Sequence, residues 1–363
     1  MGRDRRWVLT ATVAIATVTW PFFTPKVAHF YGVLSAIYAL VALSLVILAG
    51  WTGQVSLGHA AFLGFGVYIG QKVLTAGVPV PLAVLAVASF GAAVSLVLGI
   101  PSLRLRGVYL AIVTLAFGAA CQRYFFVLSS IRSYHASVVP RPDVLGLSIK
   151  GDRSLYFVVL AVFGLALLVA SNLRRSDTGR VWFAIRDSED AAQSLAIRIA
   201  PYKIGAFALS AALATTAGLF YGMLYQATPG PDQFGVLQSF FLLALPIVGG
   251  LESLAGALVG GAFLATAQPL VNALNVRLFL ASGIALIVVA LSKVDGVTGM
   301  VRSMVDTVRI ELAPADRARY GSFVPDELMG SANGSPHVEV RVDGIPPPGS
   351  LVRLRVRGAG GEP

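Results

Sequence analysis

Long apolar runs follow one another along most of this sequence, and this repetition restricts the fold more than any other feature. Each run reaches the roughly 20 residues that an α-helix needs to cross a hydrocarbon core about 30 Å thick. Hydrophobic residues make up 56% of the 363 residues, charged residues make up 13%, and the mean hydropathy is +0.76. A soluble core of this size requires far less apolar sequence. The sequence therefore predicts an all-α integral membrane protein and excludes a soluble enzyme with one apolar patch.

The apolar runs predict about ten transmembrane helices, some of them broken or re-entrant. Their approximate ranges are 8–24, 30–49, 60–77, 80–100, 107–130, 154–172, 203–225, 237–250, 255–271 and 277–293. The run at 237–250 is short and is interrupted by Gly249-Gly250, so we expect a broken helix there. The first run follows three arginines, as in a signal peptide, but Trp20-Pro21-Phe22-Phe23 offers no small-residue cleavage site. We interpret it as a retained span.

Basic residues lie in short clusters between the apolar runs, and Lys and Arg near span ends stay on the cytoplasmic side. The clusters predict a multi-pass membrane protein with both termini in the cytoplasm. The formal net charge of +10 therefore does not indicate a nucleic-acid partner. Three arginines oppose this orientation, because they lie in the loop predicted outside: Arg132, Arg141 and Arg153.

Hydrophobic density falls after residue 293, which predicts a transmembrane domain at 1–293 and a polar cytoplasmic tail at 294–363. Within the tail, apolar and polar residues alternate on both sides of Ile345-Pro346-Pro347-Pro348-Gly349, as in a β-hairpin at 337–357. A lone hairpin is marginal in water, so it needs a partner surface or stays largely disordered. The tail indicates no function.

The loop at 172–203 carries a helical pattern of its own. Ser176 or Asp177 can cap a helix, and apolar residues recur at helical spacing at Trp182, Ile185, Ala192 and Leu195. We expect an amphipathic helix at about 177–196. A transporter powered by a separate ATPase needs such an element as a contact, and an interfacial helix lying on lipid headgroups shows the same pattern.

Four segments in one order carry a more specific signal. The first covers residues 50–62 and begins Gly50-Trp51-Thr52-Gly53-Gln54-Val55-Ser56-Leu57-Gly58-His59. The second covers residues 103–118 and begins Leu103-Arg104-Leu105-Arg106-Gly107. The third runs from Gly179-Arg180 through Ala184-Ile185-Arg186 to Leu195-Ala196-Ile197, and the fourth covers residues 247–256 and includes Gly249-Gly250-Leu251-Glu252. Together they resemble the branched-chain amino-acid ABC transporter permeases of the LivM type, over about residues 31–291.

The resemblance implies the permease subunit of an ATP-binding-cassette importer, located in the bacterial cytoplasmic (inner) membrane. It implies as partners a homologous permease, two ATPase subunits and an extracytoplasmic substrate-binding protein, besides membrane lipid. It also implies that the ATPase docks on the helix at 177–196, through Gly179, Arg180, Ala184, Ile185, Arg186, Glu189 and Ala192. We expect Arg180 and Glu189 to be exposed when the ATPase is absent.

Glycines interrupt the apolar region at 50–66, where polar side chains lie close by. Non-helical backbone at membrane depth lines a cavity or is buried in protein, and transporters use such broken helices for substrate sites. The candidate substrate pathway is Gly53, Gln54, Ser56, Gly58, His59 and Thr114. The alternative is that the glycines allow close helix packing; for His59 alone we prefer an ordinary hydrogen bond to a neighbour.

Arg123 is the clearest ionisable residue within a span. It can meet a substrate carboxylate, but snorkelling towards the interface is the preferred interpretation. Glu252 is expected at a cytoplasmic turn.

Several motifs are absent from the sequence. It has neither a phosphate-binding Gly-x-x-x-x-Gly-Lys-Ser/Thr motif nor a His-Glu-x-x-His zinc motif, and Cys121 is its only cysteine. We therefore expect no enzymatic activity, no metal and no cofactor in this chain, with ATP used by partner subunits. A secondary transporter is disfavoured, because the spans hold no set of Asp or Glu for Na⁺ or protons.

Branched-chain amino acids are the first expectation for the cargo, by family frequency. Urea, short amides and other small carboxylates stay open, because the outer loop at 133–143 lacks the glycine-rich stretch typical of the family.

Overall fold

A computed structural model describes residues 17, 19–22, 24–102, 108–128, 138–143 and 149–273. The chain divides into two units, Met1–Ser303 and Met304–Pro363, and every described residue belongs to the first. The predicted span at 277–293, most of the one at 8–24, and the tail with its hairpin at 337–357 lie outside the described residues.

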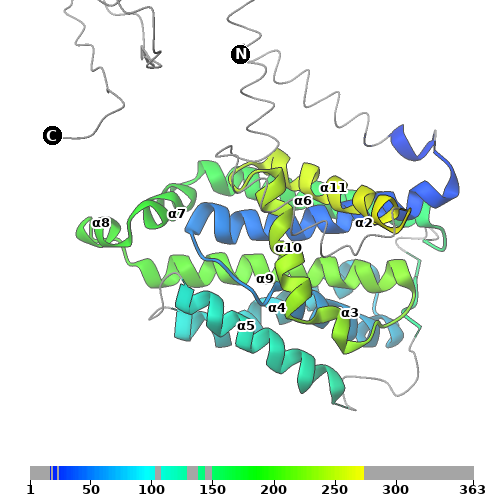
Figure 1. Cartoon of the computed structure of the whole chain (residues 1–363), viewed down its shortest axis with the longest axis horizontal. Coiled ribbons are helices and arrows are strands. Elements are labelled where there is room, and N and C mark those ends of the chain that lie inside the picture. Colours follow the sequence, from blue (N-terminus) through cyan, green and yellow to red (C-terminus); the bar gives the residue numbers. More distant parts are fainter. Residues whose placement is uncertain are drawn as a thin grey trace, which may run out of the picture. The chain divides into compact units, whose positions relative to one another are not determined.

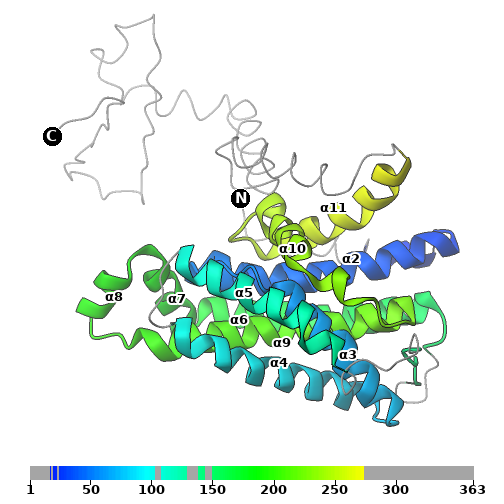
Figure 2. The ribbon, with the colours of Figure 1, turned by 60° about the horizontal axis from the view of Figure 1, so that its bottom comes forward.

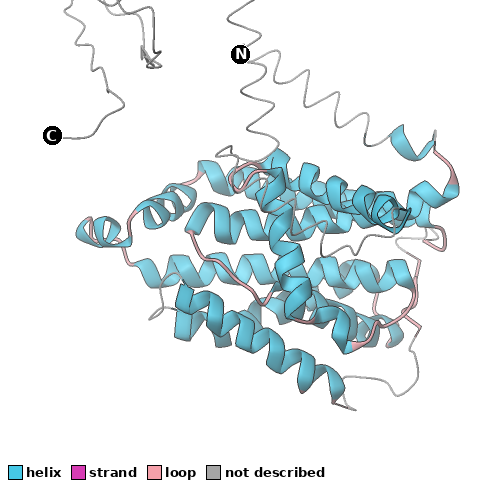
Figure 3. Cartoon of the chain, in the orientation of Figure 1, coloured by secondary structure: helices cyan, strands magenta, loops and turns pink. Residues whose placement is uncertain are grey.

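The described residues form helices joined by short connections, without a strand among them (Figure 3). The longer helices correspond to the second to ninth predicted spans: α2 (Lys26–Leu45), α3 (His59–Thr75), α4 (Val80–Ser102), α5 (Val108–Arg123), α6 (Asp152–Arg175), α9 (Ile199–Tyr225), α10 (Val236–Gly249) and α11 (Leu254–Ala273). The shorter elements are the π-helix η1 (Val46–Trp51), α7 (Asp177–Asp187), α8 (Glu189–Ser194), and the 3₁₀-helices η2 (Phe125–Val127) and η3 (Pro231–Phe234). The all-α prediction is confirmed for this part of the chain.

Five helices of the described part are long and apolar enough to cross a membrane. They are Ala28–Trp51, Val80–Gly99, Tyr109–Val127, Asp152–Arg175 and Ile199–Tyr225. α10 is shorter, and α3 has 17 residues. A multi-pass helical protein follows from these lengths, while the number of about ten crossings stays a prediction.

Two helices occupy the centre of this arrangement (Figures 1 and 2). α2 packs against α6, α9, α10 and α11, and α9 packs against α2, α3 and α4. Only about a third of each span formed by α4, α5 and α6 is buried, and large apolar side chains such as Leu85, Ile112 and Leu165 lie on the surface. In a bilayer such faces contact lipid or another membrane subunit, because lipid tails are as apolar as leucine.

α3 and α9 approach each other backbone to backbone. A Cβ atom on Gly66 would lie 2.0 Å from the carbonyl oxygen of Thr215, and one on Gly218 would lie 2.0 Å from that of Leu63. Small residues permit this separation within a membrane. For Gly66, the packing interpretation of the glycines is therefore the correct one.

The predicted break at Gly249-Gly250 is wrong in its position. α10 is continuous through Pro246 and ends at Gly249, and the turn begins at Gly250, whose φ of 111° favours glycine. The glycine pair thus ends one helix before α11 begins. Glu252 lies in this turn, as predicted, while the cytoplasmic location of the turn stays a prediction.

A real break follows α2. The helix passes into η1, which ends at Trp51, and α3 begins only at His59. Residues 53–58 are not helical, and Gly53 has a φ of +69°. We call residues 53–58 the connection.

Candidate functional site

The predicted helix at 177–196 is two helices, α7 and α8, at one end of α6 and α9 (Figure 1). Ser176 caps α7, because its hydroxyl accepts a hydrogen bond from the amide of Gly179 at 3.4 Å. Ser188 divides the two helices: it is extended, and its hydroxyl accepts from the amide of Ala191 at 3.2 Å, so that it caps α8. A second capping serine thus interrupts the predicted helix.

One face of α7 and α8 is buried, as the apolar spacing predicts. The buried residues are Gly179, Trp182, Ile185 and Ala192. The indole nitrogen of Trp182 donates to the carbonyl oxygen of Tyr202 on α9 at 2.9 Å. Leu195 departs from the prediction, because it follows the end of α8 and its side chain is 73% exposed.

Gly179 lies where α7 turns away from α6. A Cβ atom there would lie 2.4 Å from the carbonyl oxygen of Leu173, so a larger residue would push α7 off the end of α6. Ala184 lies on the same helix and is partly buried.

The charged residues predicted to contact the ATPase have different surroundings. Arg180 is 75% exposed and pairs with Asp177. Glu189 contradicts the expectation of exposure: its side chain is 22% exposed and pairs with Lys203, whose side chain is 4% exposed. A buried ammonium requires such a partner, because the low dielectric penalises an isolated charge.

Arg186 faces the long helices rather than the outside. Its Nη1 donates to the carbonyl oxygen of Gly50 at 2.8 Å and to Oε1 of Glu252 at 2.6 Å. Its Nε and Nη2 each donate to Oδ1 of Asp187 at 3.2 Å, and the guanidinium lies 5.3 Å from the ring centroid of Phe183. One side chain of α7 therefore holds both the end of η1 and the turn between α10 and α11.

A cavity of about 560 Å³ lies between α7 and the first turns of α9. Its lining includes Thr178, Val181, Trp182, Arg198, Pro201 and Tyr202. The lining is largely apolar, and the exposed Arg198 adds a cation.

The predicted pathway residues lie along the connection and its neighbours. The side-chain amide of Gln54 donates to Oγ1 of Thr52 at 3.0 Å and to the carbonyl oxygen of Lys203 at 3.3 Å. The amide of Leu57 donates to Oγ1 of Thr114 at 2.9 Å. The hydroxyl of Ser56 accepts from the amide of Gly58 at 3.4 Å, and both residues are buried.

His59 begins α3 and contacts a serine that the sequence analysis did not consider. Its Nε2 lies 2.9 Å from Oγ of Ser210. The hydroxyl of Ser210 donates its hydrogen bond to the carbonyl oxygen of Ser44 at 2.7 Å. The serine hydroxyl has one proton, so His59 must donate through Nε2, and its Nδ1 is an acceptor in the neutral ring. The expected ordinary hydrogen bond is present. Ser44 and Ser210 could have been identified from the sequence, because each is a serine within an apolar run.

Three buried polar atoms lack a hydrogen-bond partner within the described residues: Nε1 of Trp51, Oε1 of Gln54 and Nδ1 of His59. Buried polar groups are nearly always paired, and each exception requires an explanation. All three flank or belong to the connection.

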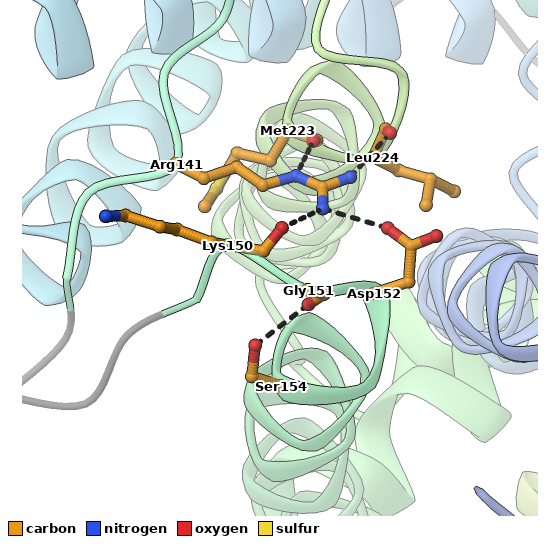
Figure 4. Close-up of polar contacts among 7 residues, drawn as sticks. All are labelled: Arg141, Lys150, Gly151, Asp152, Ser154, Met223 and Leu224. Carbon is orange, nitrogen blue, oxygen red and sulfur yellow. Dashed lines mark hydrogen bonds and ion pairs between the residues drawn. The ribbon is translucent and has the colours of Figure 1, made fainter. Parts of the chain in front are cut away.

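Two of the three arginines that oppose the predicted orientation have structural partners at the other end of α6 and α9. Arg141, with a side chain 6% exposed, donates to the carbonyl oxygens of Met223 at 2.6 Å and Leu224 at 2.8 Å, and pairs with Asp152 at 2.8 Å (Figure 4). Its Nη1 also donates to the carbonyl oxygen of Lys150 at 3.2 Å.

The guanidinium of Arg153 lies 4.0 Å from the ring centroid of Phe22, and Arg132 lies outside the described residues. Arg123 is exposed in the last turn of α5, which agrees with snorkelling.

Comparison with known proteins gives a consistent picture. Residues 28–291 match the family described as branched-chain amino acid transport system / permease component. The chain is 30% identical over 324 residues to the high-affinity branched-chain amino acid transport system permease protein LivM of Salmonella typhimurium, covering 81% of this chain and 75% of the relative. The LivM protein of Escherichia coli gives the same identity and coverage. No solved structure matches.

Proposed function

The chain belongs to the family of branched-chain amino acid transport permeases, and from this we propose that it is the membrane subunit of an ATP-driven importer for branched-chain amino acids. The observation that carries the proposal is the arrangement of α7 and α8. Their inner face is fixed to the long helices through Trp182, Arg186 and Glu189, while Arg180 stays exposed. A helix pair attached in this way can transmit a displacement to the membrane helices.

The external partner of α7 and α8 is the ATPase, and this places their end of the molecule in the cytoplasm. The cavity beside α7 would receive an apolar side chain of that partner, and Arg180 and Arg198 would contact its acidic residues. ATP is bound and hydrolysed by the ATPase subunits rather than by this chain, whose family consists of permease components. The assembly also contains a homologous permease and an extracytoplasmic binding protein.

The connection lines the solute pathway in this proposal. Oε1 of Gln54 and Nδ1 of His59 are acceptors without a partner in the described part of the chain, and a solute with N–H groups would supply donors for them. Amino acids have such groups, as do urea and short amides, which stay the alternative cargo. The polar atoms support a nitrogen-bearing solute but do not distinguish between these classes.

The test is uptake into proteoliposomes containing the chain with a homologous permease, ATPase subunits and a binding protein of the same family from the same organism. Leucine, isoleucine, valine, urea and acetamide are offered separately, each with and without ATP inside. ATP-dependent uptake of the three amino acids supports the proposal. Uptake of urea or acetamide instead supports the alternative cargo, and uptake independent of ATP would overturn the importer assignment.

A further inference from the structure

Three segments that lie far apart in the sequence converge on one side chain. Arg186 on α7 contacts Gly50 at the end of η1 and Glu252 in the turn between α10 and α11. These two segments also touch each other, since a Cβ atom on Gly50 would lie 1.8 Å from the carbonyl oxygen of Leu251. No larger residue fits between them.

Aromatic rings pack together beside Arg186 and Gly50. The centroid of the Trp51 ring lies 6.3 Å from that of Trp182 and 6.1 Å from that of Phe183. The ring of Phe183 lies under the guanidinium of Arg186. Such packing restricts a side chain to one rotamer, so that Arg186 follows any movement of α7.

The connection begins three residues after Gly50 and packs directly on Arg186. A Cβ atom on Gly53 would lie 3.2 Å from Cγ of Arg186, and the backbone of Gly53 is left-handed. The guanidinium thus binds the backbone just before the connection, and its aliphatic part contacts the first residue within it.

Polar atoms at the connection have interactions still to make. The acceptors of Gln54 and His59 and the donor of Trp51 are buried and have no hydrogen-bond partner among the residues that the structure describes. Each such group costs about 1–3 kcal/mol. A movement that gives them partners, or presents them to a solute, would recover this free energy, and the non-helical backbone at 53–58 is where it can occur.

We propose that Arg186 is the positioning residue that transmits a displacement of α7 to the connection, so that the connection and the turn at 250–253 move together with α7. This inference rests on the importer function proposed above and identifies which residue joins the ATPase contact to the solute pathway. The role expected for Arg186 from the sequence, a contact to the ATPase itself, is replaced by an internal one.

The test measures how accessible the connection is, through a cysteine introduced at Val55. This residue is exposed and lies near the middle of the connection. In a Cys121→Ala background, maleimide labelling of Val55→Cys is timed in the reconstituted importer, in ADP and in ATP with vanadate. With Arg186 present we expect the labelling rate to differ between the two nucleotide states. With Arg186→Gln we expect this difference to fall by roughly tenfold, because a charge-assisted hydrogen bond to the backbone is lost.

Uptake per ATP hydrolysed is measured on the same variants. Arg186→Gln should hydrolyse ATP yet import roughly tenfold less solute per ATP, and Arg186→Lys, which keeps the charge but can satisfy only part of the contacts, should lie between it and the unmodified chain. Glu252→Gln should also be intermediate, since the bond to Gly50 remains. The matched control is Arg175→Gln, at an exposed arginine in the last turn of α6, which should change neither readout.

Unchanged labelling and unchanged uptake per ATP in Arg186→Gln would overturn the role of Arg186 while leaving the importer function intact. Equal losses in Arg186→Gln and Arg175→Gln would also overturn it, because a general effect of surface charge would then suffice. An unmodified complex that imports nothing from the panel would instead overturn the proposed function, and this inference with it.

Discussion

The ammonium group of Lys203, which is almost fully buried near the start of α9, pairs with the carboxylate of Glu189 at the start of α8. This ion pair fixes the second helix of the α7–α8 pair to a central membrane helix. It also changes which residues are suitable for testing the ATPase contact.

Glu189→Gln is expected to destabilise the protein by about 2–4 kcal/mol, because it leaves the Lys203 ammonium buried without a counter-charge. Replacing both residues, Glu189→Gln with Lys203→Met, should recover most of this loss, since no buried charge remains. Thermal unfolding of the purified chain in detergent, followed by tryptophan fluorescence, measures both. A single variant as stable as the unmodified protein would show that the pair contributes nothing. Glu189→Lys is unsuitable as a probe of the ATPase contact, because it would place a second cation beside Lys203.

Arg180→Glu is the better probe of the ATPase contact. Its side chain is exposed and pairs only locally with Asp177, so we expect a change in stability within about 0.5 kcal/mol. Co-purification of the ATPase and ATP-dependent uptake should nevertheless fall. Lys150→Glu, an equally exposed charge reversal at the other end of α6, serves as the control. Equal ATPase recovery with both variants would count against docking on α7.

Arg141→Leu should destabilise the chain by about 3–5 kcal/mol, because Asp152 loses its partner and the last carbonyl groups of α9 lose their donor. Arg153→Ala removes only a cation–π contact near the same end of α6, and about 0.5–1 kcal/mol is expected. Melting temperatures of the two variants give the comparison. Similar shifts in melting temperature would mean that the buried network around Arg141 contributes no more to stability than the cation–π contact of Arg153.

Gly66→Ala should lower stability by about 1–3 kcal/mol or prevent assembly, since its methyl group would overlap the carbonyl of Thr215. Gly164→Ala is the matched substitution, because a Cβ atom there meets nothing within 4 Å inside the helix α6. It should be neutral or stabilise by up to about 1 kcal/mol. Expression level and melting temperature distinguish the two. Equal effects would contradict the close approach of α3 and α9.

The sequence predicted the helices well because apolar length is a local property. The eight long helices from α2 to α11 follow the predicted ranges, with boundaries shifted by a few residues. The break between η1 and α3 follows from glycines that can be read directly, such as Gly53. The division at Ser188 was missed because a serine within a helical pattern is compatible with continuation, and only the structure shows that it caps α8.

The pairing of charges could not be predicted, because it depends on segments that are distant in the sequence. Basic residues between the spans were interpreted as orienting cations, whereas Lys203 is buried against Glu189 as a result of the packing of α8 on α9. Arg186 was included in the predicted ATPase contact, but the direction of its side chain was unknown, since a helical pattern does not show which neighbours lie beneath a charged residue. Its contact with Gly50 spans 136 residues.

The contacts of Arg141 also bear on the order in which this protein is made. Met223 lies 82 residues after Arg141, so the guanidinium cannot bind the carbonyl groups of α9 until the ribosome has completed that helix. Before then only its nearer partners, Lys150 and Asp152, are present, and its burial is completed when α9 arrives. The contacts between Arg141 and the end of α9 therefore form late in biogenesis. An arginine that opposes the predicted orientation becomes part of the structure that stabilises this end of the helix.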